Sequence, residues 1–454
     1  MEYRLNRFIG EERFTILKKI LILAVPSMIE MLLTTLVSIA DTIMIGKYLE
    51  SAGISAMAMA NQIVFPVVFI FSALNAGTTA IVARHIGAKE YEKANEGAGQ
   101  SLLLNLSIGL ILVLTMVIFH EKFIRLFPAK ENIIDLSLEY LRIVIYSQFF
   151  MLITFSVSSS LRGAGDTKTP MLVNGAVNIL NIVGNAFLIY GLWIFPEMGM
   201  GGAALSTTIS RALGAIFLIA LTFVGNKKIK LTLENLKLKI KMIKRIVKIG
   251  WSAAIEQCFM QTSFIVINFM IIALGEVSHA IFNMVIRIES ISFMPAFGIS
   301  IAATTLVGQY LGAEKKEMAV KSGNVAAALG AIMGLFLGMM FFMFPKALIS
   351  IFVSDILTIN AAIVPVRIAA FQEWAIAVML IYAGALRGAG DTKRVMLVTI
   401  LRVWGIFVPL TYLFINLTNM GIKGVFFATN IEFLVPAALF YLRFNSGKWL
   451  DIEV

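Results

Sequence analysis

Charged side chains are scarce in this sequence. Asp, Glu, Lys and Arg make up 14% of the 454 residues, whereas hydrophobic residues make up 59%. A soluble globular protein carries about 25% charged and about 45–50% apolar residues. The composition therefore argues against a soluble fold and indicates a chain that lies in a membrane.

Cysteine and histidine are scarce as well. The single cysteine, Cys258, excludes an internal disulfide and a cysteine metal cluster, and it falls in an apolar run, as a small buried side chain does. The three histidines lie apart, near the ends of apolar runs and without the spacing of metal ligands: His85, His120 and His279. Motifs of nucleotide, metalloprotease and serine hydrolase sites are absent. We therefore predict no enzyme, no cofactor and no metal site other than one for a coupling ion.

Long hydrophobic runs fill most of the chain. A helix that crosses a bilayer needs about 20 mostly apolar residues, and the predicted spans are 15–45, 53–83, 94–118, 132–160, 168–192, 200–224, 245–273, 278–310, 317–343, 358–385, 394–416 and 421–443. We predict an all-α polytopic membrane protein with 12 transmembrane helices. The opening segment is basic and polar, so no cleaved signal peptide is predicted.

Positive charge is concentrated on one side of the predicted membrane. With the N-terminus inside, most Lys and Arg residues fall in cytoplasmic segments, among them Arg4, Arg7 and the run from Lys227 to Lys248. The outer loops carry only Lys47, Lys122, Arg125, Lys130, Lys346 and Lys423. This bias follows the positive-inside rule and predicts a prokaryotic inner-membrane protein with both termini in the cytoplasm. Contact with anionic membrane lipids accounts for the net charge of +11, so no nucleic-acid partner is predicted.

An internal repeat divides the chain. The octapeptide Leu-Arg-Gly-Ala-Gly-Asp-Thr-Lys at 161–168 returns at 386–393, which defines the repeat offset. A second loop repeats at the same offset, because Thr79, Val82, Gly87 and Ala88 meet Thr304, Val307, Gly312 and Ala313. We predict two pseudo-symmetric six-helix bundles, 1–224 and 245–454 with a short cytoplasmic tail, joined by the basic cytoplasmic linker 225–244. Each half has an even number of spans, so the halves share one orientation.

The repeated octapeptide is predicted to be a structural turn between two spans. Its glycines permit unusual backbone angles, its aspartate can cap the following helix, and its basic residues are expected to face the cytoplasm. It lacks the Gly-Lys-Ser/Thr ending of a nucleotide-binding loop.

Two groups of polar residues in the first half each share one helix face. On the first predicted span, helical spacing places four polar residues on one face, flanked by Glu30: Ser27, Thr34, Ser38 and Asp41. On the fifth, the same kind of spacing aligns Asn174, Asn178, Asn181 and Asn185. An ionised side chain near the bilayer centre costs at least about 2.5–3.5 kcal/mol on insertion scales, so it normally faces a cavity. A carboxylate with several amide oxygens suits a hard cation. We therefore predict a cation-coupling site of Asp41, Thr34, Asn178, Asn181 and Asn185.

The repeat offers a test of this site. At the repeat offset, Asp41, Asn178, Asn181 and Asn185 correspond to Val266, Val403, Ile406 and Leu410. An architectural role would more naturally appear in both halves, so the asymmetry favours function. A hydrogen-bonded ladder that packs the helices remains the alternative.

The sequence resembles the multidrug and toxin extrusion (MATE) family of the MOP flippase superfamily. The resemblance rests on the repeated turns, on Ala40-Asp41-Thr42, and on the run from Ile286 to Pro295 that leads to Leu311-Gly-Ala313. It implies a V-shaped pair of six-helix bundles around a central cavity, and it implies that Asp41 matches the first-helix carboxylate of the family's cation site. One departure is that Asn185-Ala186 stands where related members typically carry Asp-Pro, which weakens the case for a proton site made of paired carboxylates.

The second half carries its own polar residues within the predicted spans. Candidates for a second coupling or substrate site are Glu256, Gln257, Gln261, Asn283, Arg287, Glu289 and Glu373. The three acids could instead neutralise Arg287 and Arg367 in salt bridges between helices. The carboxylate positions of NorM-like members align here with Met260 and Ile376, so their cation site cannot be carried over.

The resemblance and the polar residues together predict a secondary active transporter that exports organic cations or drugs in exchange for Na⁺ or H⁺. The expected partners are a small organic cation and membrane lipids, and the protein is expected to be a monomer. The alternative is a flippase for lipid-linked saccharide or peptidoglycan precursors, in which intramembrane arginines would hold a pyrophosphate: Arg142, Arg211, Arg287, Arg367 and Arg402.

Overall fold

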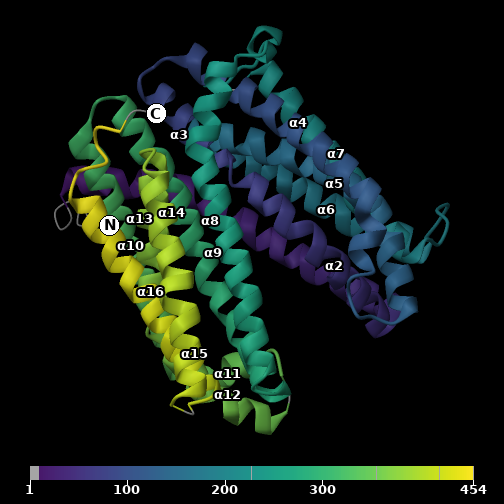
Figure 1. The fold of residues 1–454 in the computed structure, drawn as a ribbon. Coiled ribbons are helices and arrows are strands. Elements are labelled where there is room, and N and C mark those ends of the chain that lie inside the picture. The colour runs from purple at the N-terminus through teal and green to yellow at the C-terminus, as the bar shows by residue number, and fades with distance from the viewer. Residues whose placement is uncertain (1–9, 226–227, 354, 419, 453–454) are drawn as a thin grey trace. The chain divides into compact units, whose positions relative to one another are not determined.

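The computed structural model describes residues 10–225, 228–353, 355–418 and 420–452, and these residues are almost entirely helical (Figure 1). Arg4, Arg7 and Lys227, which belong to the predicted charge bias, lie outside the described residues. The earlier elements are α2 (Glu11–Ser72), α3 (Asn75–Gly87), α4 (Tyr91–Ile124), α5 (Glu131–Gly163), α6 (Lys168–Tyr190), α7 (Gly199–Val224) and the 3₁₀-helix η1 (Leu233–Leu236). The later elements are α8 (Ile240–Ile272), α9 (Glu276–Gly312), α10 (Lys316–Met343), α11 (Pro345–Ser350), α12 (Ile356–Ala370), α13 (Glu373–Gly388), α14 (Thr392–Ile400), the π-helix η2 (Leu401–Phe407), α15 (Val408–Asn416) and α16 (Ile422–Asn445).

The prediction of an all-helical polytopic membrane protein is confirmed. Among the described residues, 10 helices are long and apolar enough to cross a membrane, or up to 11 when the bent pair α12 and α13 counts as one span. The first of these helices runs over 77 residues, Glu11–Gly87, and therefore covers both of the first two predicted spans. Non-helical angles at Glu50, with φ 52° and ψ −143°, separate its two parts.

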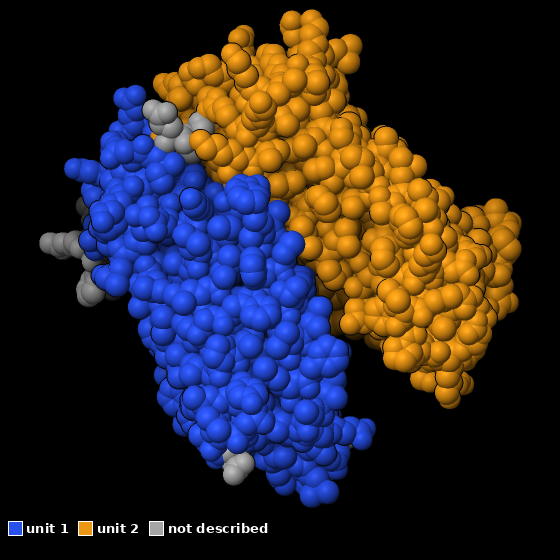
Figure 2. All heavy atoms as spheres, viewed as in Figure 1, with its two compact units in different colours: residues 1–28, 251–454 blue, residues 29–250 orange. Residues whose placement is uncertain are grey.

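The chain divides into two compact units (Figure 2). Unit 2 comprises residues 29–250, and unit 1 comprises residues 1–28 together with 251–454. In unit 1, Ile16 and Ile20 of α2 join a buried core with Ile299 and Ala303 of α9. In unit 2, the second part of α2 packs with α5 through side chains such as Val64 and Leu141. The predicted domain division at the linker 225–244 stays a prediction.

The repeat seen in the sequence is also a repeat of contacts. In unit 2 the Thr79 hydroxyl donates to the backbone carbonyls of Asn75 at 3.3 Å and Ser159 at 3.2 Å. In unit 1 the Thr304 hydroxyl donates to the carbonyls of Ser300 and Gly384, both at 2.8 Å. All three positions in unit 1 are related to their counterparts by the repeat offset. The offset therefore identifies structurally equivalent residues.

Close packing explains the first glycine of each repeated turn. A Cβ on Gly163 would lie 2.8 Å from the carbonyl oxygen of Thr79, and a Cβ on Gly388 would collide with that of Thr304. The predicted cap is present in unit 2, where the Asp166 carboxylate accepts the Thr169 N–H at 3.0 Å, in the first turn of α6.

Candidate functional site

Asp41 lies at the contact between α2 and α6 in unit 2. Asn185 Nδ2 donates to Asp41 Oδ1 at 2.6 Å. In the amide orientation that satisfies both of its polar atoms, Asn181 also donates to Asp41 Oδ1 at 3.1 Å and accepts the backbone N–H of Thr207 at 3.2 Å. One carboxylate oxygen thus receives two amide groups from the asparagine face of α6.

Glu30 makes a second contact between the same two helices. Asn174 Nδ2 donates to Glu30 Oε1 at 2.6 Å, and Arg162 Nη2 donates to both carboxylate oxygens at 2.7 and 2.8 Å. Glu30 to Asp41 and Asn174 to Asn185 are equal steps along their helices, each of about three turns. The two polar faces therefore run alongside each other in the same direction.

The other predicted members of the site are placed differently. The Thr34 hydroxyl donates to the backbone carbonyl of Glu30 at 2.9 Å rather than to Asp41. Asn178 Nδ2 is buried without a hydrogen-bond partner. Asn185 Oδ1 is also buried without a partner, and the Asn185 side chain is fully shielded from solvent. An unpartnered amide oxygen beside a carboxylate is the kind of ligand that a hard cation takes.

Two residues of α7 at this site were not among the predicted members. Thr207 contacts Asn181, and the charge of Arg211 acts on Asp41. Arg211 is held by Ser147 of α5, whose hydroxyl accepts from Nη1 at 2.9 Å. Thr207 and Arg211 are one helical turn apart and share a helix face, so their spacing could have revealed them.

In unit 1, Glu256 makes the counterpart of the Glu30 contact. Arg387 Nη2 donates to Glu256 Oε1 at 2.7 Å, and the Thr399 hydroxyl donates to the same oxygen at 2.9 Å. Arg387 and Thr399 are the repeat equivalents of Arg162 and Asn174. Glu256 therefore pairs with Arg387, and not with Arg287 or Arg367 as the salt-bridge alternative had it.

The arginines of the repeated turns also correct the expectation that they face the cytoplasm. The side chains of Arg162 and Arg387 are 21% and 25% exposed, and their carboxylate partners only 9% and 7%. Each arginine turns inward because a buried carboxylate needs a counter-charge.

The remaining candidates of the second half lie in several environments. Asn283 Nδ2 donates to the His279 carbonyl at 2.9 Å, Arg287 is exposed, and Gln257 and Gln261 are half-buried on α8. Glu289 accepts a hydrogen bond from Gln372 Nε2 at 2.6 Å. Glu373, also buried, has no hydrogen-bond partner for either carboxylate oxygen.

Three of the intramembrane arginines each bind a different partner within their own unit. Arg402 forms an ion pair with Glu432 at 3.2 Å, and Arg211 binds Ser147. Arg367 donates to the Phe342 carbonyl at 3.3 Å and lies over the Phe342 ring. Within the described residues, no three His, Cys, Asp or Glu side chains are close enough to hold a metal ion together.

The sequence is similar to those of known membrane transporters. The MatE family model matches the chain twice, over residues 26–187 and 252–413. A probable multidrug resistance protein NorM from Thermotoga maritima is 33% identical over 452 residues, which cover 99% of this chain and 97% of the relative. The uncharacterized transporter YisQ from Bacillus subtilis is 28% identical, over 94% of this chain and 93% of its own.

Solved structures show the same fold. A MOP superfamily transporter from Pyrococcus furiosus matches with a TM-score of 0.89 at 24% identity, covering 99% of this chain and 98% of its own. An outward-facing multidrug resistance MATE family transporter matches with a TM-score of 0.88 at 24% identity, over 95% of this chain and 96% of its own.

Proposed function

The chain belongs to the MATE family of membrane transporters, and from this premise we propose that it exports organic cations in exchange for Na⁺ or H⁺ bound at Asp41. It is a multi-pass membrane protein similar to NorM multidrug transporters and not an enzyme. The proposal adds the coupling ion, its site and the class of cargo.

The observation that carries the proposal is the polar site at Asp41, which exists in one unit only. Asn181 and Asn185 lie against Asp41, and Asn185 Oδ1 is buried without a partner. The equivalent positions in unit 1 are the apolar Val266, Ile406 and Leu410. The fold therefore forms without these polar side chains, which supports a role in binding.

The amide groups suit either coupling ion. In the structure they donate N–H groups to the Asp41 carboxylate. Na⁺ would instead need their oxygens as ligands, and a protonated Asp41 would need an oxygen to accept its O–H, so either ion is expected to turn an amide around. The nearby Arg211 supplies positive charge to the site and would compete with a bound cation.

The exchange of one ion for the other follows if the coupling cation and the organic cation each weaken the other's binding. By linkage, a cation that weakens the binding of the organic cargo is itself displaced by that cargo, with the same coupling free energy. We further propose a monomer in a prokaryotic inner membrane, in contact with lipid and with both termini in the cytoplasm. Flipping of lipid diphosphates is less well supported, because Arg211, Arg367 and Arg402 each already bind a different partner.

Efflux of a cationic dye from proteoliposomes tests the proposal, with a Na⁺ gradient and a pH gradient imposed separately. We expect one of the two gradients to drive efflux in the wild-type protein and neither to drive it in Asp41→Asn. Asp135→Asn, an exposed aspartate on α5, is the matched control and should behave as wild type. Undiminished gradient-driven efflux by Asp41→Asn would show that the ion binds elsewhere.

A further inference from the structure

Lysines crowd the part of unit 2 that joins α7 to α8. Both helices are long and apolar enough to cross a membrane, so the chain between them lies at a membrane surface. The basic segment, residues 228–248, contains one acid, Glu234, and seven exposed lysines: Lys228, Lys230, Lys237, Lys239, Lys241, Lys244 and Lys248. Such an excess of positive charge attracts an anionic surface.

The basic segment is fastened to unit 2 rather than loosely tethered. Gln100 of α4 makes three hydrogen bonds with its backbone at 235–239, each 2.8 Å long. Ile229 and Leu231 are buried in one core with Leu218 of α7. The protein therefore presents the outward side chains of this segment as a defined surface.

Large aliphatic side chains stand exposed among these lysines. Leu233, Leu238 and Ile240 are 79%, 68% and 58% exposed. From residue 237 to 241 the sequence alternates strictly between lysine and an aliphatic residue. This combination suits the surface of an anionic membrane, because the charges attract the head groups while the aliphatic side chains enter the boundary with the acyl chains. A nucleic acid or an acidic protein surface would neutralise the lysines and leave the aliphatic side chains in water.

The first turns of α8 continue the basic surface. Lys241, Lys244 and Lys248 are spaced by three and four residues and therefore share one helix face. α8 has 33 residues, more than the roughly 20 that a span needs, so its first turns can lie at the level of the head groups. Lys239 pairs with Glu96 at 2.7 Å, whereas no ion pair of these three lysines forms among the described residues. Their charge is left for a partner outside the protein.

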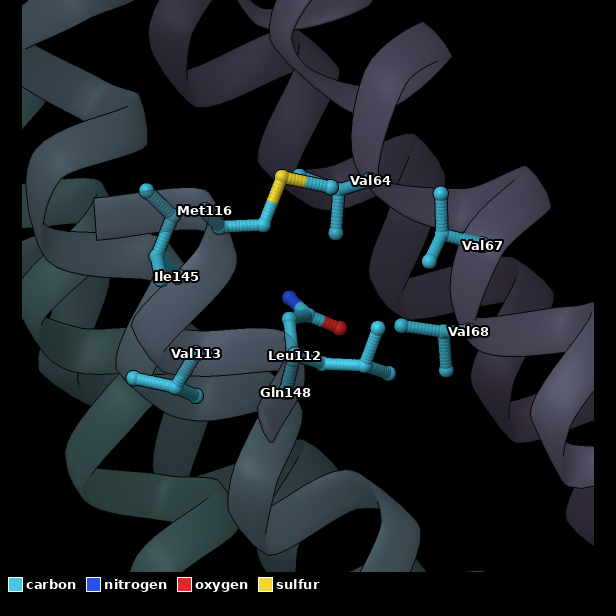
Figure 3. A pocket seen from close by; sticks show the side chains of 8 residues that line it. All are labelled: Val64, Val67, Val68, Leu112, Val113, Met116, Ile145 and Gln148. Atoms are coloured by element: carbon cyan, nitrogen blue, oxygen red, sulfur yellow. The ribbon is translucent and has the colours of Figure 1, made fainter. Parts of the chain in front are cut away.

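A pocket elsewhere in unit 2 shows the opposite chemistry. It lies among α2, α4 and α5, and apart from Gln148 its lining is apolar (Figure 3). The pocket offers an anionic group no positive charge, whereas the basic segment offers several lysines and adjacent aliphatic side chains. Charge complementarity therefore places anionic lipid at the basic segment.

We propose that the basic segment is a binding surface for anionic phospholipids, in which Lys241, Lys244 and Lys248 hold the head groups while Leu238 and Ile240 contact the acyl chains. The proposal goes beyond the transport function, which assigns no lipid site. A lysine near an anionic membrane surface strengthens association by about fivefold. The lysine face should therefore select anionic over zwitterionic lipids.

Fluorescence quenching by brominated lipids tests this proposal on the full chain in nanodiscs. Leu238→Cys in a Cys258→Ser background takes a single fluorescent label, since Cys258 is the one native cysteine. The nanodiscs contain phosphatidylglycerol and phosphatidylcholine in equal amounts, with bromine on the upper acyl chains of one lipid or the other. Bromine quenches only at short range, so the two samples together report which lipid lies beside the label. We expect a preference for phosphatidylglycerol of at least about fivefold, the effect of one lysine.

A triple variant identifies the lysines responsible. Lys241→Gln, Lys244→Gln and Lys248→Gln together should remove most of the preference for phosphatidylglycerol. The matched control carries the same loss of charge at exposed lysines of other loops and should keep the preference: Lys122→Gln, Lys130→Gln and Lys346→Gln.

Each remaining outcome counts for or against the proposal. Equal quenching by both lipids, no quenching by either, or an unchanged preference in the lysine triple variant would overturn it. If the triple variant does not fold by size-exclusion chromatography, salt provides the second measurement, because the screening length falls from about 10 Å at 0.1 M to about 3 Å at 1 M. The preference of the labelled protein should then disappear at 1 M salt, and its persistence would overturn the proposal. The readout does not depend on transport, so failure of the Asp41 proposal would leave it intact.

Discussion

Substitution of Arg162 by glutamine isolates the ion pair that ties a repeated turn to α2. The guanidinium donates to both oxygens of a Glu30 carboxylate that is only 9% exposed. Removal of one member of a buried ion pair costs about 3–5 kcal/mol, because the remaining charge stays buried without a partner. Arg162 keeps 21% of its side chain exposed and Asn174 still donates to Glu30, so we expect the low end, about 3 kcal/mol.

Thermal unfolding in detergent measures this loss. For a unit of about 200 residues, 1 kcal/mol corresponds to about 2–4 °C, so Arg162→Gln should lower Tm by about 6–12 °C. The double variant Glu30→Gln with Arg162→Gln should recover most of the loss, because no charge is left unpaired. Arg387→Gln, the counterpart in unit 1, should show a loss of similar size. A double variant no more stable than Arg162→Gln alone would contradict this prediction.

Three further predictions concern the cation site, a packing contact and the linker. Asn185→Leu removes the amide whose buried, unpartnered Oδ1 would become a ligand of Na⁺, so Na⁺ affinity measured from transport should fall by at least about tenfold. Gly388→Ala places a Cβ against a backbone carbonyl and should cost about 1–3 kcal/mol in thermal unfolding, whereas Gly175→Ala, which meets only a flexible leucine side chain at 3.3 Å, should cost less. Gln100→Ala removes three hydrogen bonds to the backbone of the linker at 235–239, each 2.8 Å long. Each is worth about 0.5–1.5 kcal/mol, so trypsin should cut the linker in this variant roughly tenfold faster or more.

Much of the fold could be predicted from the sequence because membrane helices and duplications leave strong local signals. Apolar runs indicated the spans, and the repeated octapeptide gave the offset that the contacts of Thr79 and Thr304 reproduce. The break between α12 and α13 left no such signal, because Phe371 and Gln372 are neither proline nor glycine. The break at Glu50 falls between the predicted spans 15–45 and 53–83, although the positive φ angle at this residue had no sequence signal of its own.

The candidate site was predicted only in part, because helical spacing identifies a face of one helix but not the helix that packs against it. Helical spacing placed Asp41 and Asn185 on faces of two helices, and the structure brings those faces together. Spacing cannot say which distant helix supplies a partner, so the role of Arg162 and Arg387 in neutralising buried carboxylates was missed. The repeat offset then revealed a correspondence that neither half shows alone, between Asn174 and Thr399.

The central claim is that a cation at Asp41 and the organic cargo weaken each other's binding. Its most direct test is the affinity of the purified protein for a fluorescent organic cation, measured as Na⁺ is raised at constant pH and again as pH is lowered without Na⁺. We predict that one of the two ions weakens cargo binding in the wild-type protein and has no effect in Asp41→Asn. The same dependence on the ion in both proteins would contradict it.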